Sequence, residues 1–428
     1  MSDGSNEPGD ISPGYANYVL GVLFTVYVIN FIDRQVLAVF IGPIKEEFGV
    51  SDTAMGLLVG FAFALFYTFA GIPIARWADR GNRRSIIAIG LTVWSAMTVA
   101  CGLTRSFLQL ALARVGVGVG EAAGSPPAHS LISDYFPPER RATALGIYCW
   151  GVYIGSAIAY LGGGYLRAYF DWRTAFIVLG LPGLLFALIV RFTVREPPRG
   201  YSEQRAGTGA TTTLGETLRY LLSCRSWVLM IAGSCLLSLT GYGVLMWGYE
   251  FFSRVHGMSP IEIGLWMALI VGVGGSIGTA LGGALADRLG QRDAGWYMRM
   301  PAIVTLIGLP PAFGFLLTDS ITLSLALFFP FYVLSNVYVP AMHAINQNLA
   351  QLRMRATAAA ILLFLVNIVG AGAGPFMVGF LNDLYAAQYG AEAIRYSLVT
   401  ITATSILGAL FFYLSSRALP ADLDRPRS

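Results

Sequence analysis

Charged residues are scarce in this sequence, and that scarcity excludes most soluble protein classes. Only 12% of the residues are Asp, Glu, Lys or Arg, whereas soluble domains carry about 25%. Instead, 55% are hydrophobic and the mean hydropathy is +0.63. A surface with so little charge suits lipid better than water. The net charge of +4 does not indicate nucleic acid, because the charges lie in short loops between apolar runs.

Cysteine and histidine are also scarce, and several catalytic motifs are missing. The four cysteines show no CxxC spacing, and the three histidines are scattered. The sequence has no acidic metal motif and no GxxxxGK[ST] phosphate loop. These absences disfavour a membrane enzyme and exclude an ATP-driven pump built from this chain alone. We expect no catalytic residue, no metal and no cofactor.

Long apolar runs dominate what remains, and about twelve are long enough to cross a bilayer, which takes about 20 residues. Residues 1–14 are polar and the first run is too long for a cleavable signal peptide, so it is read as the first membrane helix. The sequence predicts an all-α integral membrane protein with spans near 15–43, 52–76, 84–104, 107–132, 141–166, 173–193, 226–253, 261–286, 298–317, 321–345, 356–381 and 393–416.

One long polar stretch divides these spans into two sets of six. It contains Glu196-Pro197-Pro198 and the run from Gly207 to Thr213. The predicted organisation is a cytoplasmic tail (1–14), a six-helix bundle (15–194), a cytoplasmic linker (195–223), a second six-helix bundle (224–417) and a cytoplasmic tail (418–428).

The distribution of arginine predicts the orientation. Loops on one alternating side hold most of the arginines, and the positive-inside rule places that side, with both termini and the linker, in the cytoplasm. No N-x-[ST] glycosylation site occurs and the loops are short, which is compatible with a bacterial inner membrane.

The two sets of helices carry matching motifs. Asp79-Arg80 after the second span matches Asp287-Arg288 after the eighth, and Arg141-Ala-Thr-Ala at the fifth matches Arg355-Ala-Thr-Ala at the eleventh. Two matches at nearly one spacing indicate an internal duplication, which is typical of secondary transporters.

These motifs resemble those of a known family. The loop Gly283-Ala-Leu-Ala-Asp287-Arg288-Leu-Gly290-Gln-Arg292 resembles the signature of the major facilitator superfamily, and its first-half copy has Ala75 and Asn82 where glycines are usual. Asn30-Phe-Ile-Asp33-Arg34 and Gly118-Val-Gly-Glu121-Ala resemble the spinster branch, which is associated with the export of sphingolipids and lysophospholipids. Similar short motifs also occur in organic-anion symporters.

Four charges lie inside the predicted first and fourth spans: Asp33, Arg34, Arg114 and Glu121. A charge at bilayer depth is costly and marks a functional site by default. Counted from the span ends, Asp33 and Arg114 lie at similar depth, so an ion pair between them is geometrically allowed. We expect Asp33 to be the proton-coupling carboxylate, Arg114 its modulator and Glu121 a second acid. The alternative is that these charges only lock the two helices together.

Arg34 is expected either to contact an anionic substrate group or to pair with a neighbouring acid. The first, fourth, seventh and tenth helices line the cavity in proteins of this resemblance. Their polar and aromatic residues give the expected substrate-binding set: Arg34, Asn30, Tyr242, Trp247, Asn336 and Tyr338.

The duplicated loops predict a cytoplasmic gate. The macrodipole disfavours arginine at a helix start, so acids are expected near Arg141 and Arg355. Pseudo-symmetry places Asp79 at the start of the eleventh helix and Asp287 at the start of the fifth. The expected gate residues are Asp79, Arg80, Arg84, Arg141, Asp287, Arg288 and Arg355.

Together these features predict a monomeric, proton-coupled transporter of an amphipathic, lipid-like small molecule that works by alternating access. A multidrug exporter and an organic-anion symporter of the same superfamily are the alternatives among carriers, and a channel is the alternative outside them. The expected partners are the substrate, protons and the lipid bilayer, with no nucleic acid.

Overall fold

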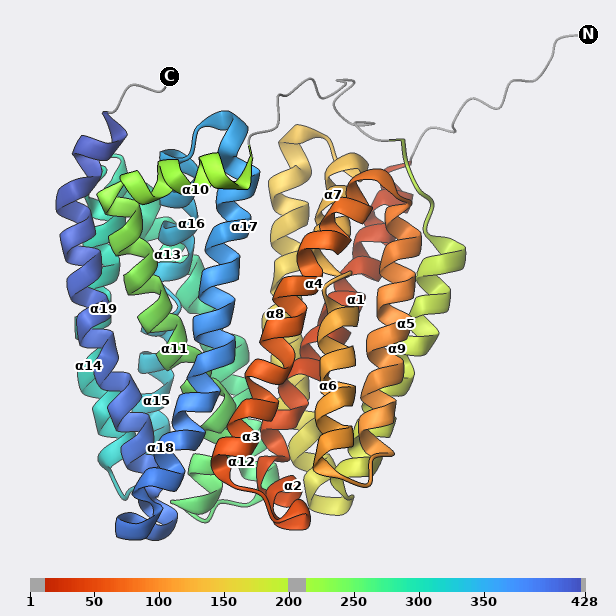
Figure 1. Cartoon of the computed structure of the whole chain (residues 1–428), viewed down its shortest axis with the longest axis vertical. Helices are drawn as coiled ribbons and strands as arrows, with labels where there is room; N and C mark the ends of the chain where they lie inside the picture. Colours follow the sequence, from red (N-terminus) through yellow and green to blue (C-terminus); the bar gives the residue numbers. More distant parts are fainter. Residues whose placement is uncertain (1–11, 199–212, 425–428) are drawn as a thin grey trace, which may run out of the picture.

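The computed structural model describes residues 12–198 and 213–424, except for the side chains of Asp79 and Leu352. This part of the chain is helical and contains no strand. The helices run side by side in two groups, α1–α9 and α11–α19 (Figure 1). We call the end of the molecule where α1 begins and α19 ends the terminal end, and the opposite end the distal end.

The first group begins with α1, whose N-cap Ser12 accepts a hydrogen bond from the Tyr15 amide. Its helices are α1 (Pro13–Val39), α2 (Ile41–Phe48), α3 (Asp52–Val59), α4 (Phe61–Arg80), α5 (Arg83–Gly102), α6 (Phe107–Glu121), α7 (Ser125–Tyr135), α8 (Pro138–Tyr169) and α9 (Trp172–Thr193).

A short helix that sequence patterning did not predict, α10 (Leu214–Ser223), precedes the second group. The second group consists of α11 (Arg225–Arg254), α12 (Pro260–Leu269), η1 (Ile270–Gly274), α13 (Gly275–Gly290), α14 (Trp296–Leu317), α15 (Ile321–Ser335), α16 (Tyr338–Leu349), η2 (Leu352–Met354), α17 (Arg355–Val366), η3 (Asn367–Ala373), α18 (Gly374–Tyr389), η4 (Gly390–Glu392) and α19 (Ala393–Leu423).

The twelve-helix fold predicted from the apolar runs is confirmed. Ten stretches of the described chain are long and apolar enough to cross a membrane, and one of them, Arg355–Leu423, is 69 residues long and is broken by η4. That stretch holds two crossings. The remaining crossing is the pair α6 and α7, whose parts of 15 and 11 residues are separated at Gly124. The break follows from Pro126 and Pro127, which cannot continue a helix that arrives from α6.

Contacts between the two groups concentrate toward the distal end, where α3 packs on α18 and α8 packs on α12. Glycines make these contacts possible. A Cβ atom on Gly60 would stand 2.3 Å from the Gly372 carbonyl oxygen, and one on Gly164 would stand 2.5 Å from the Pro260 carbonyl oxygen. Small residues at such positions let helix backbones approach closely in a bilayer.

Candidate functional site

The centre of the first group holds a buried ion pair between Arg34 of α1 and Glu121 of α6. The Arg34 guanidinium donates to one carboxylate oxygen of Glu121 through Nη2 at 2.8 Å and through Nε at 3.2 Å. The Glu121 side chain is fully buried and that of Arg34 is 12% exposed. The sequence left the partner of Arg34 open, and the structure pairs it with Glu121.

Aromatic rings enclose the Arg34 guanidinium. Its Cζ atom lies 4.6–4.9 Å from the ring centres of Phe31, Phe63 and Tyr67. Cation–π contacts of this kind are stronger where water is excluded. Tyr242, on α11, lies near the Arg34 guanidinium. The second group therefore presents Tyr242 toward a charge held by the first group.

Asp33 is fully buried beside this pair, but it differs from Glu121 in having no ionic partner in the described residues. Arg114 donates through Nη1 to the backbone carbonyl oxygen of Asp33 at 3.2 Å. Neither carboxyl oxygen of Asp33 accepts a hydrogen bond. The ion pair that depth allowed between Asp33 and Arg114 is thus replaced by a contact to the main chain.

Donors surround the Asp33 carboxyl without reaching it. The Trp94 indole and the Thr98 hydroxyl of α5 face this group, and their donor atoms are themselves buried without a partner. A buried polar atom without a partner costs about 1–3 kcal/mol. These side chains therefore form a small polar region within an otherwise apolar bundle.

The other expected substrate residues lie either beside the central charges, as Asn30 does, or within the second group, as Asn336, Trp247 and Tyr338 do. Asn30 is 4% exposed and its amide lies beside the Glu121 carboxylate. Asn336 closes α15 by donating to the Tyr332 carbonyl oxygen at 2.8 Å. Trp247 is fully buried and its indole donates to the Pro375 carbonyl oxygen at 2.9 Å. Tyr338 packs on Phe412, with ring centres 6.0 Å apart.

Trp247 and Tyr338 therefore pack within the second group, whereas Asn30 and Tyr242 lie at the central charges. Sequence reasoning missed Tyr67 and Tyr153. Tyr67 lies on the Arg34 guanidinium, and Tyr153 of α8 is hydrogen-bonded to Thr279 of α13, which joins the two groups. A tyrosine within a membrane span does not by itself indicate a contact with a buried charge or a hydrogen bond between the two groups.

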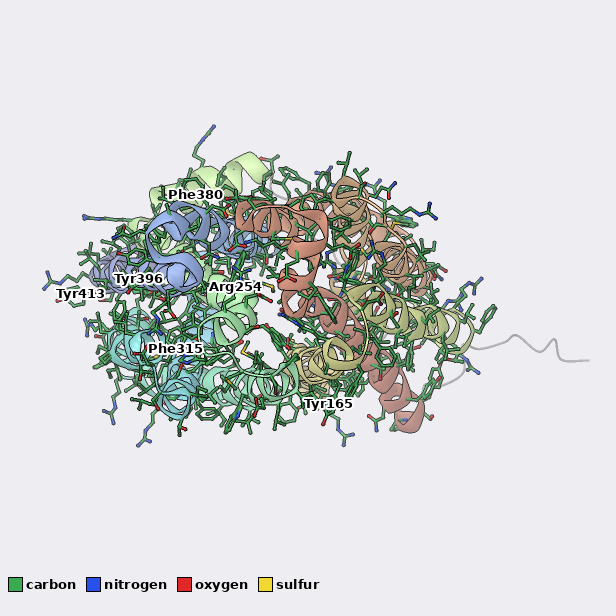
Figure 2. The ribbon with its side chains drawn as sticks, turned by 90° about the horizontal axis from the view of Figure 1, so that it is seen from below. Tyr165, Arg254, Phe315, Phe380, Tyr396 and Tyr413 are labelled. Carbon is green, nitrogen blue, oxygen red and sulfur yellow. The ribbon has the colours of Figure 1, made fainter. Side chains whose placement is uncertain are left out.

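A second set of charges, which we call the distal network, joins the two groups at the distal end: Lys45, Asp52, Arg167, Glu250 and Arg254. Asp52 of the first group pairs with Arg254 of the second at 2.5 Å, and Arg167 of the first pairs with Glu250 of the second at 2.8 Å. Viewed from the distal end, Arg254 lies in the interior near the boundary between the groups, whereas Tyr413 lies at the outer edge (Figure 2).

The ends of helices complete the distal network. Asp383 of α18 accepts hydrogen bonds from the backbone amides of Asp52 and Thr53, at 3.1 and 2.8 Å, so a carboxylate of one group caps the start of α3 in the other. A carboxylate is favoured at a helix N-terminus. A cavity of about 470 Å³ opens beside these residues. No sequence pattern predicted these pairings.

A separate ion pair at the distal end lies within the first group. Arg173, at the start of α9, pairs with Glu47 of α2 at 2.6 Å. The Arg173 guanidinium holds the pKa of the Glu47 carboxyl below its ordinary value. Because both side chains are partly exposed, the pair is screened by solvent.

At the terminal end, Asp287, Arg80 and Arg288 are exposed, and Asp287 makes no ion pair with the start of α8 in the described part of the chain. The side chain of Asp79 lies outside the described residues. Arg84 donates to the Val194 carbonyl oxygen at 3.3 Å, within the first group. Arg141 is half-buried near the start of α8, and Arg355 is half-buried at the first residue of α17. The predicted clamp remains a prediction.

Arg83, which is not among the expected gate residues, forms an ion cluster at this end. Its buried guanidinium pairs with Asp134 at 2.5 Å and with Glu196 at 2.7 Å, and it donates to the Pro197 carbonyl oxygen at 3.0 Å. The cluster ties the end of α7 and the segment after α9 to the start of α5. Among the described residues, no group of three His, Cys, Asp or Glu side chains could hold a metal ion.

Comparison with known proteins adds one family model and two relatives. Residues 23–375 match the family model described as the Major Facilitator Superfamily. The chain is 35% identical to an MFS-type efflux pump of Mycolicibacterium smegmatis, over 96% of this chain and 95% of the relative. It is 25% identical to protein spinster homolog 3 of Danio rerio, over 96% of this chain and 87% of that protein.

A solved structure is similar throughout. It is the crystal structure of a bacterial homolog to the human lysosomal transporter Spinster in an inward-facing and unoccupied conformation, with a TM-score of 0.87 and 33% identity. The match covers 97% of this chain and all of the other.

Proposed function

The chain belongs to the major facilitator superfamily, in its spinster branch, and on that premise we propose that it is a proton-coupled carrier of an amphipathic, lipid-like small molecule. As a member of this family it is an integral membrane transporter and not an enzyme. The proton coupling, the lipid-like substrate, the monomeric state and the bacterial inner membrane are parts of the proposal.

One observation carries the proton coupling: Asp33 is a fully buried carboxyl group with no hydrogen bond to either oxygen. Burying an ionised carboxylate without a partner is far more costly than burying the neutral acid. Proton uptake therefore favours the arrangement in which Asp33 is enclosed as it is here. Loss of the proton favours an arrangement in which Arg114 or water reaches the carboxylate, and this preference couples the proton to the conformation.

The Arg34–Glu121 pair supports substrate binding at the same place. A substrate with an anionic head group can replace Glu121 as the ionic partner of Arg34. A substrate with a cationic head group can replace Arg34 as the partner of Glu121. The rings of Phe31, Phe63 and Tyr67 around Arg34 offer an apolar surface for the rest of an amphiphile. Tyr242, on α11, supplies a polar contact from the second group.

Alternating access follows from the distribution of contacts between the groups. The distal network holds the distal end together, and the expected clamp of Asp79 and Asp287 belongs to the opposite state. We propose that the terminal end faces the cytoplasm, as the arginine distribution indicates, so that the described conformation is open to the cytoplasm. Breaking the distal network and forming the terminal clamp would then expose the site to the other side.

The test is substrate-driven proton flux in proteoliposomes with an imposed pH gradient, for wild type and Asp33→Asn, with a lysolipid or sphingoid amine as the probe. We expect flux in the wild type and its loss in Asp33→Asn. Asp171→Asn is the matched control, because Asp171 only caps α9 and asparagine also caps helices well. Full gradient-driven transport by Asp33→Asn would refute the coupling role.

The relative named as an efflux pump favours one alternative, a proton-coupled multidrug exporter. Competition between substrates distinguishes the lipid carrier from the multidrug exporter and from the organic-anion symporter. Inhibition of lysolipid flux by cationic drugs, with the drugs themselves carried at least as fast, would support the exporter. Flux carried only by organic anions would support the symporter.

A further inference from the structure

The short helix α10 carries a stripe of three exposed leucines. Leu214, Leu218 and Leu222 are four residues apart and so lie along one face of the helix. Their side chains are 60%, 38% and 56% exposed. This is a high exposure for three leucines in ten residues, because each loses the stabilisation of burial.

Of the other two faces of α10, one packs on the protein and the other is polar and exposed. Thr217 and Leu221 are fully buried against the second group, and the Tyr220 hydroxyl donates to the Leu349 carbonyl oxygen at 3.3 Å. Arg219 and Ser223 lie on the exposed side. The helix therefore has one face on the protein, one apolar face and one polar face, the pattern of a helix in the plane of a membrane interface.

The position of α10 agrees with that pattern. The helix lies crosswise over the terminal end of the second group, whereas the membrane-spanning helices beside it run along the long axis of the molecule (Figure 1). Its end leads through Cys224 directly into α11, where Val228 is a further exposed apolar residue. A reciprocal capping box of Thr213 and Glu216 fixes the first turn, so the stripe begins at a defined place.

The charge around the stripe selects the kind of membrane surface. Arg219, Arg225 and Arg353 are exposed near α10, and the one acidic side chain within the helix, Glu216, bonds back to the Thr213 amide at 3.0 Å. Basic residues next to an apolar face attract anionic phospholipids, by about 1 kcal/mol for each residue near the surface.

We propose that α10 is a docking helix for the lipid bilayer: its leucine stripe enters the leaflet at the terminal end while Arg219 and the neighbouring Arg225 and Arg353 contact anionic phospholipid head groups. The contact does not depend on the transported substrate. Because α10 packs on both α11 and α17, it also joins that leaflet to two helices of the second group.

The test places a fluorescent label on each face of α10 in the full-length protein. Cys149 and Cys235, which are not fully buried, are first replaced by serine. An environment-sensitive label is then attached to Leu218→Cys on the stripe or to Ser223→Cys on the polar face. Both proteins are reconstituted into phosphatidylcholine vesicles with and without phosphatidylglycerol.

We expect lipid-attached quenchers to quench the label at position 218, and aqueous iodide to quench the label at 223. Leu222→Cys, on the same stripe, replaces Leu218→Cys if that variant does not fold. Phosphatidylglycerol should strengthen the lipid quenching, and each of Arg219→Gln and Arg225→Gln should reduce that gain by up to about fivefold. Equal iodide quenching at both positions overturns the proposal. Disulfide-linked dimers through position 218 also overturn it, because the stripe then contacts a second copy.

Discussion

The two sets of buried charge differ in what they join. The central set consists of Asp33, Arg34, Arg114 and Glu121, and its ion pair and hydrogen bonds lie within the first group of helices. The distal network crosses between the groups, with an acid and a base contributed from each side. The central set therefore holds helices of one group together, whereas the distal network stabilises one arrangement of the two groups.

This comparison explains why one set is incomplete and the other is not. The distal network has an ionic partner for each of its acids. Asp33 in the central set has none in the described structure, so its energy depends on whether it carries a proton. A structural lock works best when every charge is paired, and a coupling site needs one charge whose pairing changes.

The largest expected effect is on the central pair. Arg34→Gln leaves Glu121 buried without its partner, which costs about 3–5 kcal/mol. We expect a large fall in the thermal unfolding temperature of the detergent-solubilised protein. The double variant Arg34→Gln with Glu121→Gln removes both charges and should recover most of that loss. Equal losses in the single and double variants would show that the pair is not coupled.

The second prediction breaks the distal network alone. Asp52→Asn removes the carboxylate that pairs with Lys45 and Arg254, at a cost of about 1.5–3 kcal/mol to the closed distal end. This shifts the equilibrium between closed and open distal ends by roughly ten- to hundredfold. Spin labels at Glu46 and Ala391, on opposite groups, should report a new population at longer distance.

Glu47→Gln is the control for that measurement, because the Glu47–Arg173 pair lies within one group. It should leave the distance distribution unchanged. The same widening in both variants would mean that the distal network has no special role in closure.

The third prediction separates the two tyrosines of the second group that sequence reasoning treated alike. Tyr242 faces the Arg34 charge, whereas Tyr338 packs on Phe412. Tyr242→Phe should raise the KM for transport by up to about tenfold through the loss of one hydrogen bond to substrate, with kcat little changed. Tyr338→Phe should leave KM unchanged. Equal effects in the two variants would contradict the placement of substrate beside Arg34.

The smallest effect concerns the exposed pair at the distal end. Because Arg173 lowers the pKa of Glu47, the pair stabilises the fold above the ordinary pKa of 4.5 and loses that contribution as pH falls through the lowered value. Glu47→Gln should cost about 0.2–1 kcal/mol at neutral pH. Unfolding temperatures of the two proteins should converge in strong acid and in high salt. A difference that persists in both conditions would assign the effect to packing.

Several features could be read from residues alone. The apolar runs predicted the crossings, and the residues Ser125-Pro126-Pro127 account for the break that the structure has between α6 and α7. The positions of the four central charges along the first and fourth spans also predicted that they lie in one region of the membrane. These positions did not determine their pairing, because the rotation of α1 against α6 decides which acid Arg34 reaches.

The distal network shows the limit of such reasoning most clearly. Asp52 and Arg254 are each ordinary residues at the end of a helix, and nothing in their local sequence links them. Their contact depends on the orientation of one six-helix group relative to the other. The helix α10 is a similar case, since ten residues in a polar linker give a weak signal until their docking face is known.

The sequence by itself determined that this chain crosses a membrane twelve times, that its halves are duplicated and that acids are buried in the first half. These properties follow from hydropathy, repetition and the cost of charge in lipid, all of which are local or additive along the chain. The packing of the helices, by contrast, sets which charges meet. It pairs Arg34 with Glu121, leaves Asp33 without an ionic partner in the described residues, and joins the two groups through ion pairs at the distal end. Ion pairing falls off within a few ångströms, so it depends on helix rotation and on the angle between the halves, which no local pattern encodes.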